Sequence, residues 1–279
     1  MNTRIIVDST VDLMPEFKSR VHTVPLTVCF GDQEYIDGVT IDHKAFYEKL
    51  IESDVLPTTS QATPDAFIKE LEKAKEAGDA AVVITLASKF SGTYQSAIIA
   101  ADDYENIYVV DSGSAAMGSG ILVELAFKLL DEGKNAEEIA TILEEEKKKI
   151  IIVALLDTLE YLKKGGRISK AVAFAGGVLN IKPVLSVIDG EINMLGKARG
   201  SKMGNNLLVE EINKAGGIDF DKPVLLGYSG ISDALLLKYI EDSRHIWEGN
   251  LDEVRYTTVG SVIGTHAGPG AVVVAFFKK

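Results

Sequence analysis

The sequence is poor in the residues that build disulfides and metal sites. Cys29 is the only cysteine among 279 residues, which excludes an internal disulfide and any paired-cysteine metal or redox motif. The four histidines include no i, i+4 pair, so the spacing typical of a helical zinc site is missing as well. We therefore expect no metal, and we interpret Cys29, inside the apolar run 23–30, as a small buried hydrophobic residue.

Positive charge and long apolar runs are also scarce. The chain has 29 Lys and Arg against 41 Asp and Glu, a net charge of −12, so nucleic acids and anionic membranes would repel it. No apolar run approaches the roughly 20 residues that span a bilayer, and the N-terminus becomes polar too soon for a signal peptide. We expect a cytoplasmic protein that binds no nucleic acid and does not insert stably into a membrane.

Both common nucleotide-binding signatures are absent. The sequence contains neither Gly-x-Gly-x-x-Gly nor Gly-x4-Gly-Lys-Ser/Thr. Glycines 113, 118 and 120 have the wrong spacing for a phosphate loop and are interpreted as sites of close helix packing. We therefore expect no nucleotide cofactor.

What the chain has is a regular alternation of apolar strands and amphipathic helices, with 46% hydrophobic residues. This pattern predicts an α/β fold of two domains. Residues 1–149 are expected to form a parallel-type α/β/α sheet. Residues 150–279 are expected to form a mixed sheet, because Asp189-Gly190 lies between two apolar runs and predicts an antiparallel hairpin.

Several local expectations accompany this fold. A helix from Asp42 to about Glu52 should bury Phe46, Leu50 and Ile51 on one face. Residues 56–64 are too polar and too rich in proline to be regular, and the glycine-rich segment 259–270 reads as a loop. A helix of small residues should end near Gly177.

The strongest functional signal is a strand that ends in a hydroxyl-rich loop. Val82 to Leu86 predict a buried strand, Ser91-Gly92-Thr93 a tight turn, and Tyr94 to Asp103 a helix. Such a loop directs backbone N–H groups and hydroxyls at one point, which suits an anionic oxygen. The alternative is that Ser91 or Thr93 only caps the helix.

Two other places carry polar chemistry. His266, among glycines directly before the last strand, could donate to an anion or only stabilise a turn. Arg167 follows two glycines and could bind a carboxylate or phosphate, or only end a helix. Ser91 and His266 with Asp111 or Asp157 could form a hydrolase triad, but no nucleophile elbow surrounds Ser91.

Taken together, the motifs resemble the DegV family of bacterial lipid-binding proteins. They follow one another from residue 8 to residue 270: Asp8-Ser9-Thr10, Pro25-Leu26, Tyr35-x-Asp37-Gly38, Pro57-Thr-Thr59-Ser60-Gln61-Ala-Thr-Pro64, Ser91-Gly92-Thr93-Tyr94-Gln95-Ser96, Asp111-Ser112, Leu162-Lys-Lys-Gly165-Gly166-Arg167-Ile168, Lys182-Pro183, Lys197-x-Arg199-Gly200 and Ile263-Gly264-Thr265-His266-x-Gly268-Pro269-Gly270.

The resemblance implies a carrier that is not itself an enzyme and needs no cofactor. It would hold one long-chain fatty acid, with the carboxylate at the domain interface and the tail in an apolar tunnel, and present it to a separate fatty acid kinase that makes an acyl phosphate. Arg199, with Lys202, resembles the position that docks the kinase, although Ser201-Lys202-Met203 replaces the commoner Lys-Lys-Ala. By motif, the head group would be surrounded by Thr59, Ser60, Ser91, Gly92, Thr93, Arg167, Thr265 and His266.

The small-residue segments Ala115 to Gly120 and Ala171 to Val178 are candidate tunnel walls, although core packing would explain them equally well. Two other functions stay open at this point. One is a serine acyl-hydrolase that uses Ser91 and His266. The other is a small-molecule phosphotransferase, because the dihydroxyacetone kinase family has a related architecture.

Overall fold

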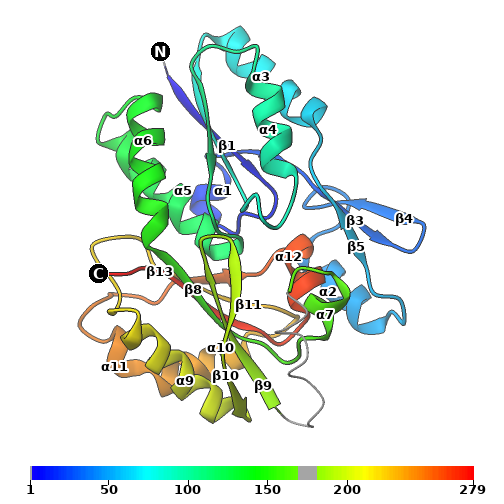
Figure 1. Cartoon of the computed structure of the whole chain (residues 1–279), viewed down its shortest axis with the longest axis vertical. Helices are drawn as coiled ribbons and strands as arrows, with labels where there is room; N and C mark the ends of the chain where they lie inside the picture. Colours follow the sequence, from blue (N-terminus) through cyan, green and yellow to red (C-terminus); the bar gives the residue numbers. More distant parts are fainter. Residues whose placement is uncertain (1, 169–180) are drawn as a thin grey trace.

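The computed structural model describes residues 2–168 and 181–279. The first part of the chain forms a parallel sheet in the order β2-β1-β6-β7. β6 is buried along its whole length. Helices α3 and α4 cover one face of this sheet, and α5 and α6 cover the other (Figure 1). The bounds are β1 Thr3–Asp8, β2 His22–Val24, β6 Ala80–Thr85, β7 Ile107–Asp111, α3 Pro64–Ala77, α4 Thr93–Ala101, α5 Ala116–Asp131 and α6 Ala136–Glu146.

The second part forms a mixed sheet in the order β10-β9-β8-β13-β11-β12. The only parallel pair among these described strands is β11 with β12. The predicted hairpin is confirmed: Asp189 and Gly190 join β9 to β10, with φ of 50° and 67°. The bounds are β8 Ile150–Leu155, β9 Ile181–Ile188, β10 Glu191–Arg199, β11 Leu225–Tyr228, β12 Tyr256–Thr258, β13 Val272–Phe277, α9 Ser201–Lys214, α10 Ala234–Asp242 and α11 Arg244–Trp247.

Helix α5 lies between the two sheets. It contacts β1 and β6 on one side and β8, β11 and β13 on the other. Thirteen of its 16 residues are buried, which explains why its sequence is apolar all round. Helices α9 and α10 cover the opposite face of the mixed sheet. The predicted α/β class, with a parallel and a mixed sheet, is therefore confirmed.

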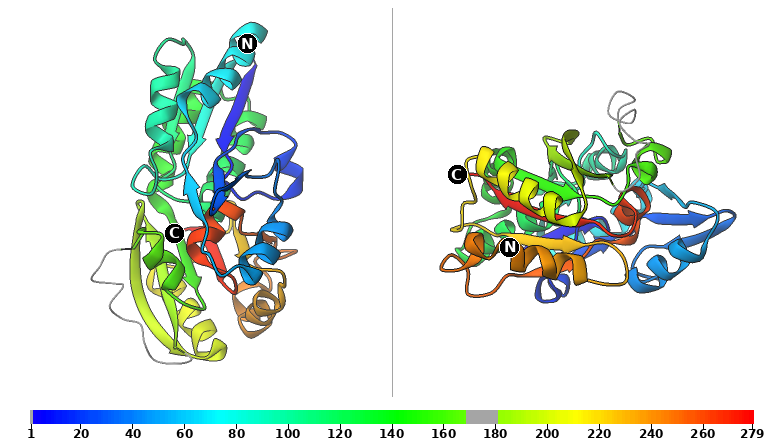
Figure 2. Two further views of the ribbon diagram at one scale, coloured as in Figure 1. Left: turned by 90° about the vertical axis from the view of Figure 1, so that its right-hand side faces the viewer. Right: turned by 90° about the horizontal axis from the view of Figure 1, so that it is seen from below.

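A small antiparallel sheet, β4-β3-β5, projects from the side of the molecule and packs near α2 (Figures 1 and 2). Its strands are β3 Thr27–Phe30, β4 Gln33–Ile36 and β5 Thr58–Ser60, and α2 is His43–Glu52. The expectation of an irregular segment 56–64 was wrong at β5, which pairs with β3. Ile51 was also misplaced: its relative exposure is 54%, whereas Phe46 and Leu50 are buried.

The expected glycine-rich loop at 259–270 is instead built around a helix, α12 (Ser261–Ala267). The helix contacts α2, β3 and β5 on one side and α7 (Glu160–Lys164) on the other (Figure 2). Gly264 permits this packing, because a Cβ there would lie 2.5 Å from Tyr47 Oη. Gly268, with φ of 70°, ends the helix. The glycines therefore serve close packing and termination, not an open loop.

The domain boundary at residue 150 stays a prediction. The parallel sheet ends with β7, and the mixed sheet begins with β8 at Ile150. One continuous core nevertheless joins residues from both halves, among them Ile5, Met117 and Val273. The small-residue helix expected to end at Gly177 lies outside the described residues. Within the described ranges, no helix combines the length and apolar character needed to cross a membrane.

Candidate functional site

A cavity of about 440 Å³ lies where the two sheets, the small β3–β5 sheet and α12 meet. Its size falls in the range of about 300–1,000 Å³ that is typical of small-molecule sites. Most of its lining is apolar. The apolar side chains are Leu26, Leu86, Phe90, Ala115, Ala116, Ile152, Ala154, Leu156, Leu162, Leu185, Val187, Ile192, Val259, Val262, Ile263, Ala267 and Val273.

Strand alternation explains how the mixed sheet supplies one apolar wall. Ile152 and Ala154 lie on the same face of β8, opposite Val187 and Leu185 of β9 in the sheet register, and all four line the cavity. The intervening residues of β8, such as Val153, belong to the separate core under α9 and α10. One face of the sheet therefore packs against α9 and α10, and the other is shared between α5 and the cavity.

The predicted tunnel-wall segment 115–120 contributes only Ala115 and Ala116 to the lining. The rest of this segment is buried within α5. Gly118 illustrates the packing, because a Cβ there would lie 2.0 Å from Ser114 Oγ and 2.7 Å from Ile152 Cδ1. The other predicted wall, 171–178, lies outside the described residues.

The cavity is also lined by a smaller set of polar residues and one glycine. Thr59, Ser60, Gln61, Ser91, Gly92, Arg167 and His266 all line it. Thr93 and Thr265 do not; both are buried, and the Thr265 hydroxyl donates to the carbonyl of Ser261. Six of the eight predicted head-group residues therefore line one cavity.

Ser91 presents its hydroxyl proton to the cavity. Ser91 Oγ accepts from the Thr93 backbone N–H at 3.3 Å and lies 3.0 Å from Thr93 Oγ1. Thr93 Oγ1 accepts from Ala62 N–H at 3.3 Å. Since Thr93 is fully buried, its own proton has no described acceptor except Ser91, and an undonated buried proton is costly. We therefore assign Thr93 as the donor, which leaves the Ser91 proton free.

His266 leaves the hydroxyl proton of Thr59 free, as Thr93 does for Ser91. His266 Nε2 lies 3.1 Å from Thr59 Oγ1, and the buried Nδ1 has no hydrogen-bond partner in the described part of the chain. Orphaned buried N–H groups are rarer than orphaned acceptors, so the proton is assigned to Nε2, which donates to Thr59. Burial, and next the charge of Arg167, lower the pKa of His266 to about 4. The imidazole is therefore neutral near pH 7, and Thr59 is left with a proton to donate.

Two glycines make room for these groups. A Cβ on Gly165 would lie 2.1 Å from His266 Nδ1, and a Cβ on Gly92 would lie 2.2 Å from Gln61 Oε1. Gly92 has an ordinary φ of −71°, so the turn does not require a glycine; the missing Cβ leaves space for the end of the Gln61 side chain.

Arg167 lies at the edge of the cavity and is exposed. Its Nη1 donates to the carbonyl of Gly165 at 2.6 Å, and its Nε donates to the carbonyl of Phe90 at 3.3 Å. It thus joins the segment after α7 to the loop after β6, and its other N–H groups have no hydrogen-bond partner among the described residues.

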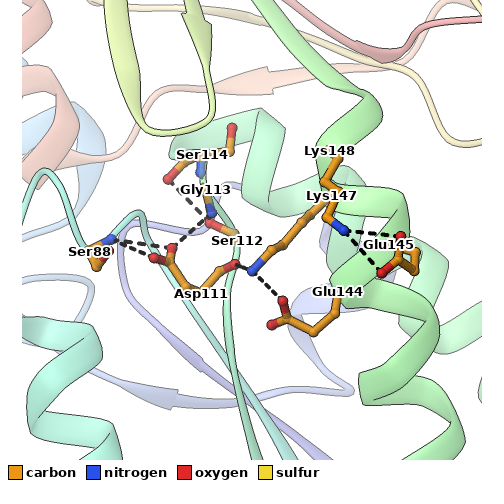
Figure 3. Close-up of polar contacts among 9 residues, drawn as sticks. All are labelled: Ser88, Asp111, Ser112, Gly113, Ser114, Glu144, Glu145, Lys147 and Lys148. Carbon is orange, nitrogen blue, oxygen red and sulfur yellow. Dashed lines mark hydrogen bonds and ion pairs between the residues drawn. The ribbon is translucent and has the colours of Figure 1, made fainter.

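The residues considered for a hydrolase triad are not arranged as one. Ser91 pairs with Thr93 and His266 with Thr59. The Asp111 carboxylate accepts from the N–H groups of Ser88 and Gly113, as Figure 3 shows, and Asp157 pairs with Lys182 at 2.7 Å. The described residues also contain no group of three or more His, Cys, Asp or Glu side chains that could hold a metal ion.

The sequence matches the model of an uncharacterised family, the DegV family, over residues 2–279. The chain belongs to the DegV family. A DegV domain-containing protein of Caldanaerobacter subterraneus is 36% identical over 281 residues, which cover 99% of this chain and 98% of the relative. The resemblance inferred from the motifs is thereby confirmed.

Solved DegV structures share the fold. A DegV family protein from Thermus thermophilus, reported for its fatty acid binding, is 31% identical, with a TM-score of 0.87 over 99% of this chain and 100% of that one. The fatty acid kinase B3 protein of Streptococcus pneumoniae, solved with linoleic acid, also has a TM-score of 0.87, over 100% of both chains. Its identity of 24% shows the common fold alone.

Sequence reasoning missed most of the apolar lining. The alternation Ile152, Ala154, Leu156 could have been read as one strand face, but nothing in the sequence says which face meets a cavity. Gln61 lies in the motif at residues 57–64 that contributes to the family resemblance, but no role was predicted for it. The Asp8-Ser9-Thr10 motif does not line the cavity; Asp8 accepts from Leu86 N–H at 2.7 Å and from Thr10 N–H at 2.9 Å, so it orders the strand ends.

Proposed function

We propose that this protein binds one long-chain fatty acid, with the carboxylate among Thr59, Ser91, Arg167 and His266 and the tail along the apolar wall. The observation that carries this proposal is one cavity with a mostly apolar lining and a small polar set, in which His266 contacts Thr59 and Arg167 contacts the loop that carries Ser91. An amphiphile with one anionic end matches that combination. The fatty acid binding reported for the Thermus thermophilus relative supports it.

Burial of the tail supplies most of the affinity. A chain of about fifteen methylenes, at roughly 0.8 kcal/mol each, gains on the order of 10 kcal/mol before the cost of ordering it. The walls that receive it are side chains without polar atoms, such as Ile152, Leu185 and Val187. Affinity should therefore grow with chain length until the cavity is filled.

The polar cluster offsets the cost of removing a carboxylate from water. An unpaired carboxylate is expensive to bury, and each charge-assisted hydrogen bond recovers part of that cost. The hydroxyls of Ser91 and Thr59 both have protons to donate, and Arg167 adds a positive charge at the edge. The protons of Ser91 and Thr59 and the charge of Arg167 favour a carboxylate over an uncharged alcohol or ester.

The alternative functions receive less support. A serine hydrolase needs the nucleophile hydrogen-bonded to its base, but Ser91 and His266 each pair with a different threonine. A phosphotransferase would need a place for a nucleotide, and neither nucleotide signature occurs in the sequence.

We further propose that the bound acid is presented to a separate fatty acid kinase, so that catalysis takes place on the partner. Arg199, at the end of β10, and Lys202, at the start of α9, are both exposed and would form the docking site. The family resemblance, through the Arg199-Gly200 motif, supports this assignment.

Mass spectrometry of an organic extract tests the central proposal. Protein purified without detergent should release a long-chain fatty acid in near-stoichiometric amount, and delipidated protein should take it up again. A fatty alcohol of equal length should bind far more weakly. A clean extract together with no uptake of added acid would overturn the proposal.

A further inference from the structure

The loop that carries Ser91 is held in place by residues that do not touch the cavity. The Ser88 N–H lies 3.2 Å from both carboxylate oxygens of Asp111, and the Gly113 N–H donates to Asp111 Oδ1 at 2.9 Å. Lys147 Nζ donates to the Asp111 carbonyl at 2.8 Å (Figure 3). Asp111 therefore fixes both the start of the loop after β6 and the turn after β7.

The tip of the β9–β10 hairpin meets the same loop from the other half of the molecule. Lys89 Nζ donates to the carbonyl of Asp189 at 3.0 Å and to Glu191 Oε1 at 3.0 Å. The Gly190 N–H donates to the carbonyl of Gly113 at 2.6 Å. Gly190 is suited to this contact, because its φ is +67° and a Cβ there would lie 3.1 Å from Ala87 Cβ.

Three consecutive loop residues are thus bonded to three different elements. Ser88 is bonded to Asp111, Lys89 to the hairpin tip, and the Phe90 carbonyl to Arg167. The next two residues, Ser91 and Gly92, line the cavity. The position of the Ser91 hydroxyl therefore depends on these contacts.

The hairpin is itself a cavity wall. Leu185 and Val187 of β9 and Ile192 of β10 line the cavity, as do Phe90 and Ser91 of the loop after β6. The Lys89 contacts therefore join the wall that would hold the tail to the loop that would hold the head group. Separation of the two would open the cavity between them.

We propose that Lys89 and Glu191 are positioning residues whose ion pair holds the hairpin against the Ser91 loop and so slows release of the bound acid. This inference rests on the fatty acid binding proposed above. Lys89 and Glu191 side chains are 48% and 65% exposed. Exposed ion pairs are individually weak and are screened by salt, so the effect on release should be modest and salt-dependent.

The test measures the rate constant of fatty acid dissociation by stopped-flow displacement of a fluorescent fatty acid. K89M keeps the aliphatic stem of the side chain, and E191Q keeps its shape. Each should raise the dissociation rate about two- to fivefold, the range expected of an exposed pair, and leave the association rate unchanged. In the wild type, release should become faster from low to high NaCl, and in K89M this increase should be smaller.

Lys214→Met is the control, because the exposed Lys214 pairs with the half-buried Glu211 on α9, away from the loop. It should release the ligand at the wild-type rate. Wild-type rates in K89M and E191Q, or an equal change in Lys214→Met, would each overturn the proposal.

A second measurement does not depend on ligand. Amide hydrogen exchange at residues 88–92 of the delipidated protein should be faster in K89M than in the wild type. If the wild type binds no fatty acid but exchange is still faster in K89M, the proposed function fails, whereas the role of the Lys89–Glu191 pair in holding the loop stands. If exchange in K89M equals that of the wild type, the role of the pair is itself refuted.

Discussion

His266 Nε2 lies 3.1 Å from Thr59 Oγ1, although the two residues are 207 positions apart in the sequence. The contact brings the last turn of α12 against β5, and both residues line the cavity. Because the imidazole donates to Thr59, the threonine hydroxyl becomes a directed donor, with its proton available to a carboxylate.

Replacement of Thr59 by valine should therefore weaken fatty acid binding about tenfold, the loss expected when a hydrogen bond to a charged group is removed. Valine keeps the branched shape, so the β3–β5 pairing should survive. Thr59→Ser restores the hydroxyl and serves as the control in an equilibrium titration. An equal loss of affinity in both variants would show that fatty acid binding depends on the shape of the side chain and not on its hydroxyl proton.

Binding should not depend on the charge of His266 between pH 6 and pH 8. Its pKa is lowered to about 4, mainly by burial, so the ring gains no proton within that range. A protonated ring would instead strengthen carboxylate binding as the pH falls toward 6. Titrations of the wild type and of His266→Gln at both pH values distinguish the two cases. A gain in wild-type affinity at pH 6 that the variant lacks would contradict the neutral ring.

Ser91→Ala should lower fatty acid affinity about tenfold, and it should also cost about 1–3 kcal/mol of stability, because the buried Thr93 hydroxyl loses its acceptor. The helix-cap interpretation predicts a loss of about 1 kcal/mol in stability with unchanged affinity, so the affinity decides between the two. Thr63→Ala provides the comparison, because Thr63 caps α3 by accepting from Ala66 N–H and does not line the cavity. Calorimetry and ligand titration of both variants separate the roles.

Local rules predicted the parts of the fold that short segments determine. Asp189-Gly190 predicted its hairpin because two consecutive residues with positive φ suit only a few side chains. The same reasoning failed at α12, where Gly264 is needed because Tyr47, far away in the sequence, packs against it. The glycine pattern looked like a loop because the partner that requires it lies outside any local window.

The candidate site was predictable to a different degree. Ser91 could be found from a strand that ends in hydroxyls, whereas the proximity of Thr59 and His266 followed only from the family resemblance. Lys89 gave no signal at all, since a lysine in a polar loop is ordinary. Its contacts with Asp189 and Glu191 depend on how the two halves meet, which no pattern within either half encodes.

The free energy of unfolding should fall as the pH rises, because Asp12 is buried with a proton in the folded state. Burial raises its pKa to about 8, and the lowering effect of its hydrogen bond from Gly260 N–H is smaller. Between about pH 4 and pH 8 the folded state holds a proton that the unfolded state has lost, so stability falls with pH by up to roughly 1.4 kcal/mol per unit. Asp12→Asn should remove this slope in urea unfolding. Parallel wild-type and variant curves at pH 5.5 and 8.5 would refute the assignment.

Arg199→Ala should separate binding from presentation. Arg199 is exposed at the end of β10 and does not line the cavity, so fatty acid affinity should stay within about twofold of the wild type. If its guanidinium docks the kinase, acyl phosphate formation should fall by about tenfold or more, the usual cost of an arginine at the centre of an interface.

The control for a nonspecific loss of charge is Lys44→Ala, which removes an exposed cation from α2. A phosphorylation assay with saturating fatty acid keeps ligand binding out of the comparison. Because the acid is then bound equally by both variants, any difference measures the encounter with the kinase; an equal loss in Lys44→Ala would mean that overall charge, and not a docking contact at Arg199, sets the rate.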